Sequence, residues 1–241
     1  EADELGTYPL KETILRSNVK PEEIDEVIVG CCGQPAHAAN VGRVIALRAG
    51  IPYHVPAITV HRNCASGMEA ISTGAQRLLL GDADIVATVG VETMSRYPLF
   101  YNQQMTDLFE GLMKAKTFGQ RLSVLSKFRL GHLKPVIALK LGLTDPYCNL
   151  IMGNTAENVA KKFKISRQDQ DIFALQSHLK VLEAQAQGRF DDEIIAVHVP
   201  DAYQQTITAD NGARKGQSIE ALQKLKPFFD RKLGSVTVGL L

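Results

Sequence analysis

The sequence predicts a layered α/β fold in which helices cover a sheet. Segments rich in β-branched residues alternate, along the first 90 residues, with segments whose apolar residues recur at helical spacing. The run Asp84–Gly90 is apolar and β-branched, as in strands that are covered on both faces. With 241 residues, of which 45% are hydrophobic, the chain is long enough to bury a sizeable core.

The first fifty residues supply two predicted helices and a strand. Asp3 and Glu4 lie in the first turn of the first helix, where acidic side chains complement the helix dipole. Gly50 ends the second helix. The predicted elements are a helix over Ala2–Ser17, a helical turn over 21–24, a strand over Glu26–Gly30 and a helix over Ala38–Ala49.

The stretch from Ala57 to Arg96 places a cysteine where a strand meets a helix. The pattern predicts a strand through Ile58–Val60, a turn over Asn63–Gly67, a helix over Met68–Leu80 stopped by Gly81, and a strand over Asp84–Gly90. The apolar residues of this helix gather on one side: Met68, Ile71, Ala75, Leu78 and Leu79. At such a junction free N–H groups and the helix dipole favour the thiolate of Cys64, the nucleophilic form. A buried structural cysteine is the alternative interpretation.

Composition excludes several classes of protein. A net charge of +1 argues against nucleic acid as the main partner. The cysteines Cys31, Cys32, Cys64 and Cys148 show neither a C-x-x-C pair nor metal-ligand spacing, so we expect no metal and a reducing compartment. No apolar run reaches transmembrane length, and no signal peptide is visible. The chain begins without Met, so its start is expected to lie further upstream.

The residues around Cys64 read N-C-A-S-G-M-E-A, and a later segment reads G-D-A-D-I-V-A-T-V-G-V-E-T-M-S. Both resemble the thiolases, enzymes that make or cleave 3-ketoacyl-CoA thioesters. The resemblance implies a layered α/β N-terminal domain in which Cys64 accepts the acyl group, with coenzyme A as substrate and no separate cofactor. His61 is a candidate base for Cys64. A residue three positions earlier on a strand points elsewhere, so we favour a packing or dimer-contact role for it.

The segment from Gln103 to Thr144 has a different composition. Between Glu110 and Asp145 there is no acidic residue, and seven Lys or Arg residues alternate with bulky apolar ones. This mixture is typical of a segment on an anionic membrane surface, which we predict for residues 112–141. A solvated helical hairpin and a contact with CoA phosphates are the alternatives. The letters F-G-Q-R-L-S-V-L-S-K-F-R resemble the membrane-associated thiolase β-subunit of the trifunctional fatty-acid oxidation complex, which favours the membrane.

Two later motifs resemble the loop domain with which thiolases hold CoA. M-G-N-T-A-E-N-V-A enters a helix capped by Asn154 or Thr155, and R-Q-D-Q-D-I-F-A-L-Q-S-H lies in a helix from Ser166 to Gln187. A strand is predicted over Glu193–Val197. The resemblance implies CoA contacts by Met152, Arg214, Phe229 and Val238. Arg214 is also a fixed cation suited to phosphate, although a solvated loop arginine is the alternative.

The resemblance divides the chain into three parts. It implies an N-terminal α/β domain with the nucleophile loop over 1–101, an inserted, mostly helical loop domain over 102–232, and a return strand over 233–241. It covers nearly the whole chain but only the N-terminal portion of a thiolase. The family's first strand, its G-H-P histidine base and its second cysteine are absent, so this chain alone is expected to be inactive. Ile151 replaces a histidine of short-chain biosynthetic thiolases, which fits a larger acyl group.

The predicted function is that of an acyl-CoA C-acyltransferase, a 3-ketoacyl-CoA thiolase of fatty-acid β-oxidation. The alternatives are a short-chain acetyl-CoA acetyltransferase and a non-catalytic, membrane- or partner-binding module with a thiolase fold. A ketoacyl-ACP synthase shares the fold, but the G-V-E-T-M-S and CoA-loop motifs disfavour it. Expected partners are acyl-CoA and CoA, further copies in a homodimer or tetramer, and a β-oxidation α-subunit. We expect a bacterial cytoplasmic or mitochondrial matrix location with membrane association.

Overall fold

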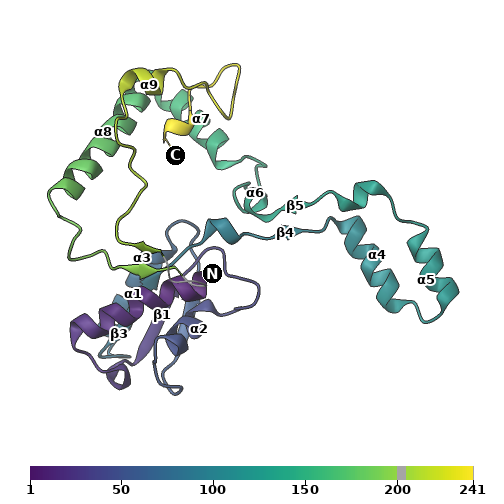
Figure 1. Ribbon diagram of the computed structural model, residues 1–241, viewed down its shortest axis with the longest axis horizontal. Helices are drawn as coiled ribbons and strands as arrows, with labels where there is room; N and C mark the ends of the chain where they lie inside the picture. The colour runs from purple at the N-terminus through teal and green to yellow at the C-terminus, as the bar shows by residue number, and fades with distance from the viewer. Residues whose placement is uncertain (200–204, 241) are drawn as a thin grey trace. The chain divides into compact units, whose positions relative to one another are not determined.

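The structure, a computed structural model, describes residues 1–199 and 205–240 (Figure 1). Contacts group the chain into two compact units. The first comprises Glu1–Arg96 with Gln168–Leu225, and the second comprises Tyr97–Arg167 with Lys226–Leu241. The expected division into domains at 1–101, 102–232 and 233–241 stays a prediction.

A parallel three-stranded sheet forms the centre of the first unit. Its strands are β1 (Glu26–Gly30), β2 (Ala57–Val60) and β3 (Val86–Gly90), in the order β2-β1-β3. The register pairs Gly30 with both Val60 and Gly90, so the three strands end at the same level. This arrangement confirms the predicted α/β class. The third strand begins two residues later than the sequence predicts, because Asp84 and Ile85 donate their backbone N–H groups to the Asp25 carboxylate instead.

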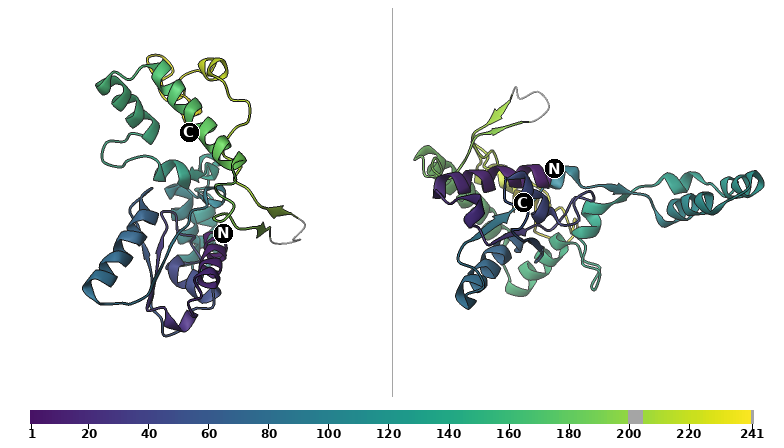
Figure 2. Two further views of the ribbon diagram at one scale, coloured as in Figure 1. Left: turned by 90° about the vertical axis from the view of Figure 1, so that its left-hand side faces the viewer. Right: turned by 90° about the horizontal axis from the view of Figure 1, so that it is seen from below.

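Helices cover both faces of this sheet (Figure 2, left). On one face α1 (Ala2–Ser17) packs against α2 (Val41–Arg48), and on the other face lies α3 (Ser66–Leu80). The observed bounds of α1 match the prediction. The second helix begins three residues later than predicted, because the side chain of Asn40 accepts the N–H of Arg43 and caps the helix there.

The core of the first unit lies between the sheet and the α1–α2 pair. Alternate residues of β1, Val27 and Val29, face this core, where they join Leu10 of α1 and Val41 and Ile45 of α2. All five are essentially inaccessible to solvent. Burial of this apolar surface stabilises the layer at roughly 25 cal/mol per Å².

The helix α3 packs on the sheet through its small residues. Ala70 is fully buried, and Gly74 lies so close to β3 that a Cβ there would approach Thr88 Cγ2 to 2.9 Å. The apolar side seen in the sequence points outward instead, with Met68 75% and Leu79 86% exposed. The small side brings the helix nearer to the strands, which leaves the larger apolar side chains uncovered in this chain.

The remainder of the first unit is less regular. It contains the long helix α8 (Arg167–Ala186), the two-residue strands β6 (Val197–His198) and β7 (Thr206–Ile207), and the short helix α9 (Ile219–Gln223). The observed bounds of α8 agree with the predicted helix. The predicted strand over Glu193–Val197 is wrong for most of its length, because the N–H groups of Glu193 and Ile194 donate to the carbonyl of Phe190 and hold the start of this segment in a turn.

The second unit carries a helical hairpin at the end of a narrow ribbon (Figure 1). The strands β4 (Leu99–Phe100) and β5 (Val136–Ile137) pair in antiparallel fashion, and the chain between them forms α4 (Gln103–Lys114) and α5 (Phe118–Leu125). The two helices contact each other where Gly111 of α4 faces Val124 of α5. The hairpin α4–α5 contains residues 112–125 of the basic segment 112–141, and the chain that returns to β5 contains residues 126–135.

The rest of the second unit is built around α7 (Met152–Phe163), preceded by the short helix α6 (Ala138–Gly142). The N-cap of α7 is Ile151, not Asn154 or Thr155 as predicted. Residues 233–237 form no strand, and Val238–Leu240 is a 3-10 turn, whereas a return strand was expected over 233–241. The N–H groups of Ser235 and Val236 bind a side chain of α7, so they are not available to a neighbouring strand. Leu241 lies outside the described residues.

The short 3-10 turns complete the described elements. They are Pro21–Glu23, Met94–Arg96, Leu130–Leu133 and Val238–Leu240. The first confirms the predicted helical turn after residue 20.

Candidate functional site

Cys64 lies in the tight loop between β2 and α3, as the sequence predicts. The loop begins at the carboxyl end of β2 and ends at the first turn of α3, and the side chain of Cys64 is exposed. A buried structural cysteine, the alternative interpretation, is therefore wrong for this position. The thiol is accessible to a substrate beside the positive end of a fifteen-residue helix.

The buried hydroxyl of Ser66 holds the loop in shape. Ser66 Oγ donates to the carbonyl of Asn63 at 2.6 Å and accepts the N–H of Arg62 at 2.9 Å. The backbone of Asn63 adopts a left-handed conformation, with φ of 48°, which asparagine tolerates better than most residues. Two bonds to one side chain and a left-handed turn together fix the backbone on both sides of Cys64.

Three glycines allow α3 to start close to the strand ends. A Cβ on Gly30 would overlap the backbone carbonyl of Ser66, and a Cβ on Gly90 would approach the Cα of Gly67 to 3.1 Å. Larger residues would push α3 and its preceding loop away from the sheet. The close approach therefore places Cys64 at the carboxyl end of a parallel sheet, the edge at which open α/β sheets bind ligands.

Glu92, in the loop after β3, supports the same edge. Its carboxylate accepts the backbone N–H of Cys32 at 3.0 Å and that of Gly33 at 3.1 Å. Burial raises the pKa of the Cys31 thiol to about 11, and the negative charge of Glu92 adds to the effect. Burial, Glu92 and Cys64 also raise the pKa of Cys32. Both neighbours are thus poorer nucleophiles than an ordinary cysteine at neutral pH.

His61 and Arg62 are engaged within the loop. His61 Nδ1 accepts the N–H of Asn63 at 3.3 Å, and the Arg62 guanidinium forms an ion pair with Glu69 of α3. The ion pair ties the loop to the first turn of α3. These contacts agree with a supporting role for both residues. The contact of His61 is with the backbone of Asn63 and does not indicate a role as the base of Cys64.

The residues predicted to contact CoA fall into both units. Met152, Phe229 and Val238 belong to the second unit, and Arg214 belongs to the first. The ring of Phe229 lies on Gly153, the residue directly after Met152. The Arg214 side chain is exposed, and its backbone N–H donates to His178 Nδ1 at 3.3 Å.

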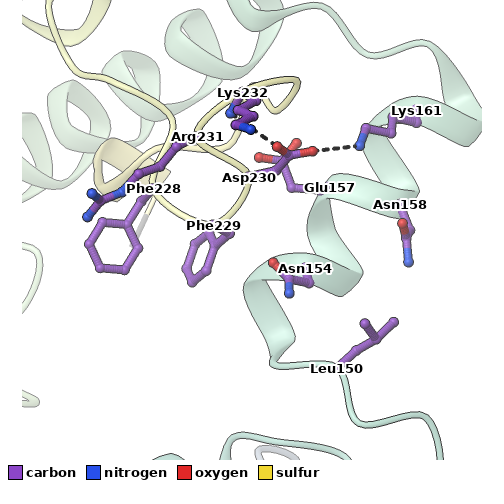
Figure 3. A pocket seen from close by; sticks show the side chains of 10 residues that line it. All are labelled: Leu150, Asn154, Glu157, Asn158, Lys161, Phe228, Phe229, Asp230, Arg231 and Lys232. Carbon is purple, nitrogen blue, oxygen red and sulfur yellow. Dashed lines mark hydrogen bonds and ion pairs between the residues drawn. The ribbon is translucent and has the colours of Figure 1, made fainter.

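An open pocket of about 520 Å³ lies beside Phe229 within the second unit (Figure 3). Its lining comes from one side of α7, from Leu150 just before that helix and from the segment Phe228–Lys232. The rings of Phe228 and Phe229 meet edge to face, with centroids 5.1 Å apart. Lys161 bonds to Asp230 at 3.1 Å across the pocket. The pocket thus offers two aromatic rings next to charged groups.

Sequence reasoning missed two carboxylates that bind backbone. In the sequence Glu92 stands only within the motif G-V-E-T-M-S, and Glu157 only within M-G-N-T-A-E-N-V-A. The structure buries Glu157 to 2% exposure and gives it backbone donors. A signal was present in the sequence, because the acid interrupts the side of α7 that also carries Gly153 and Ala160.

Within residues 1–199 and 205–240, no group of three or more His, Cys, Asp or Glu side chains is placed to hold a metal ion. Among these same residues, no helix has both the length and the apolar character needed to cross a membrane.

Comparison with known proteins gives consistent results. Residues 1–240 match the family model described as thiolase, N-terminal domain. A 3-ketoacyl-CoA thiolase of Yersinia enterocolitica is 36% identical over 238 residues, which cover 99% of this chain and 54% of that protein. A probable acetyl-CoA acyltransferase of Staphylococcus aureus is 37% identical, covering 99% of this chain and 56% of that protein.

Solved structures show the same relationship. The acetyl-CoA acetyltransferase of Bacillus anthracis superimposes with a TM-score of 0.84 at 34% identity, covering 99% of this chain and 55% of that one. A human mitochondrial 3-ketoacyl-CoA thiolase in complex with CoA superimposes with a TM-score of 0.79 at 33% identity, covering 98% of this chain and 54% of that one. The chain spans about half the length of the curated relatives it matches.

Proposed function

The chain belongs to the thiolase N-terminal domain family, and from this premise we propose that it carries the nucleophile of an acyl-CoA C-acyltransferase. The proposed enzyme is a 3-ketoacyl-CoA thiolase of fatty-acid β-oxidation. The observation that carries the proposal is the exposed thiol of Cys64 at the junction of β2 and α3. The names of the relatives support the reaction class.

In the proposed reaction the Cys64 thiolate attacks the 3-keto carbon of the substrate. The bond between C2 and C3 breaks, and the electron pair passes to the departing acetyl-CoA fragment, which takes up a proton. The shortened acyl group remains on Cys64 as a thioester. The thiol of a second CoA then loses its proton, attacks this thioester and releases the thiolate of Cys64. Two transfers replace one difficult carbon–carbon cleavage.

The proposed CoA contacts are Met152, Arg214, Phe229 and Val238. Three of these residues are exposed to solvent, which supports the proposed contacts with CoA. They are Met152, Val238 and Arg214. A guanidinium can bind phosphate through two parallel hydrogen bonds. Ile151, which precedes Met152 and replaces a polar residue of short-chain enzymes, favours a larger acyl group.

The test is to trap the acyl group. The chain is incubated with acetyl-CoA and with a long-chain acyl-CoA, each labelled in the acyl group, and the labelled peptide is identified by mass spectrometry. We expect the label on Cys64 and none on Cys64→Ser, whereas Cys148→Ser, a control at the other exposed cysteine, keeps it. Label on another cysteine would overturn the proposal. If neither acyl-CoA labels the chain, the result would favour the non-catalytic module.

A second proposal concerns the hairpin α4–α5, which we infer contacts an anionic membrane surface. Large apolar side chains on it are exposed to water, including Met113 at 87%, Phe118 at 82% and Leu122 at 58%. They stand among the seven cations of residues 112–141. An ordinary solvated hairpin would not need so many exposed apolar groups. The oligomeric state, the β-oxidation α-subunit as partner and the compartment remain expectations from the resemblance.

A further inference from the structure

Glu157 is a buried carboxylate with an unusual set of partners. It lies in the middle of α7 with only 2% of its surface exposed. Its oxygens accept the backbone N–H of Ser235 at 2.9 Å and that of Val236 at 2.9 Å. Burial of a charge is costly unless hydrogen bonds satisfy it. Charge-assisted bonds to two backbone donors from a segment 78 residues further along the chain supply that compensation.

The segment that Glu157 binds is a closed loop. Its ends meet where the N–H of Phe228 donates to the carbonyl of Val236 at 3.0 Å. Asp230 shapes the turn inside it by accepting the N–H of Leu233 at 3.0 Å. Gly234 is required at the closest approach, because a Cβ there would overlap the carboxylate of Glu157. The loop Phe228–Val236 is therefore built to fit against this carboxylate.

Three residues of α7, four positions apart, hold the loop together. Gly153 leaves space for the ring of Phe229, Glu157 binds the backbone, and Lys161 forms the ion pair with Asp230 at 3.1 Å. Residues at such spacing lie on one side of a helix. Figure 3 shows the outcome, with Phe229 beside α7 and Asp230 bonded to Lys161.

We propose that Glu157 is a positioning residue for CoA binding, because it anchors the loop Phe228–Val236 so that Phe229 is held against Gly153 beside Met152. This inference rests on the proposed function, in which Phe229 and Met152 contact CoA. Packing alone would need only an apolar residue at 157. A carboxylate instead sets the position and orientation of the backbone, since its two bonds have fixed directions and lengths.

Glu157→Gln tests the proposal with little change in volume. The amide places an NH2 group against the backbone donors, so at least one bond is lost and the loop is released. We expect the dissociation constant for CoA, measured by titration calorimetry on the whole chain, to rise about tenfold. Lys162→Gln, a charge change at an exposed position of the same helix, should leave it unchanged.

Two further readouts separate positioning from general destabilisation. Backbone hydrogen exchange should accelerate within residues 228–236 and stay unchanged in the first unit. Acylation of Cys64 by a small acyl thioester that lacks CoA should keep its rate. Phe229→Ala should weaken CoA binding by a similar factor, and the double variant Glu157→Gln with Phe229→Ala should weaken it no further, because both act through the same ring.

The outcomes are distinguishable. Faster exchange in the loop without weaker CoA binding would overturn the positioning role, and so would additive effects in the double variant. Unchanged exchange would overturn the anchoring itself. If the unsubstituted chain binds no CoA while Glu157→Gln still loosens the loop, the proposed CoA contacts fail, and the functional part of this inference fails with them.

Discussion

Cys31, Cys32 and Cys64 all follow the carboxyl ends of neighbouring strands, yet their surroundings differ. Cys31 is fully buried, Cys32 is partly buried beside Glu92, and Cys64 is exposed. An apolar environment and a nearby carboxylate disfavour a thiolate, whereas water and a helix N-terminus do not. The chemistry of each thiol therefore depends on packing within a few ångströms.

Cys31 should make stability sensitive to alkaline pH. Its pKa is about 11 in the folded chain and near 9.0 when unperturbed. Because the pKa of Cys31 is higher in the folded chain than in the unfolded chain, the thiol of the unfolded chain ionises first as the pH rises. The contribution of Cys31 to the free energy of unfolding is therefore complete below pH 9 and is lost as the pH rises toward 11. We expect Cys31→Ala to lower the free energy of unfolding at neutral pH. Between pH 9 and 11 this free energy should fall less steeply in the variant than in the parent, as measured by unfolding in urea. Cys148→Ala is the control. An unchanged slope in Cys31→Ala would contradict the assignment.

Gly30 should be intolerant of even one added methyl group. In Gly30→Ala the new Cβ would overlap the Ser66 carbonyl and come within 2.7 Å of the Gly67 nitrogen. We expect a loss of about 1–3 kcal/mol in the free energy of unfolding, measured by urea denaturation. Gly119→Ala is the matched control, since that glycine has open space around it in α5, and alanine favours a helix by up to about 1 kcal/mol. Equal stability of Gly30→Ala and the parent would refute the argument.

Two helical elements expose apolar surfaces, and their charges distinguish them. The outward side of α3 carries Met68, Ile71 and Leu79. The hairpin α4–α5 combines exposed apolar groups with basic side chains and lacks acids between Glu110 and Asp145. The apolar side of α3 is suited to contact with another protein, whereas the basic hairpin is suited to contact with an anionic membrane.

The basic segment 112–141, which includes α5, should bind anionic vesicles in a salt-dependent way. Lys116→Glu, Lys127→Glu and Lys134→Glu together should reduce binding by at least about a hundredfold, because each cation contributes about 1 kcal/mol near the surface. Sedimentation with vesicles of mixed phosphatidylserine and phosphatidylcholine measures this, at low and high salt. The same change at Lys11, Lys162 and Lys180, exposed residues outside the hairpin, is the control. Equal binding to neutral vesicles, or none to either, would eliminate the membrane proposal.

At the scale of the whole molecule, three features of the described residues bear on function. They are the loop that carries Cys64, the helical hairpin α4–α5 and the loop anchored by Glu157. The chain spans about half the length of the curated relatives it matches. The resemblance to thiolases assigns the catalytic base and a second cysteine to motifs that this chain does not contain. Within the described residues, the outward side of α3 leaves large apolar side chains uncovered.

The 241-residue chain by itself should therefore not turn over substrate. Loss of one oxyanion donor costs about 3 kcal/mol, and loss of a general acid or base costs about two to four orders of magnitude in rate. The assay is thiolysis of acetoacetyl-CoA and of a long-chain 3-ketoacyl-CoA, compared with a longer homologue. Acylation of Cys64 without turnover is the expected result. Turnover within tenfold of the homologue would show that a base lies within these residues, and His61→Ala would be the first variant to examine.

The sequence by itself determined the features that depend on short-range pattern. The bounds of α1 and α8, the strands β1 and β2, and the junction that carries Cys64 follow from local propensity, capping and turn chemistry. The reaction class came from motifs around that junction, which the family match confirms at the level of the family.

Only the tertiary structure decided which side of α3 packs, how the end of the chain is held and what Glu157 does. Hydrophobic spacing groups Met68 and Leu79 on one side of the helix, but the close approach of Gly74 to β3 makes the small side the one that packs on the sheet. The expected return strand is absent from residues 233–240 because Glu157 takes the N–H groups that a strand would offer. These outcomes depend on contacts between residues far apart in the chain, which local sequence patterns do not encode.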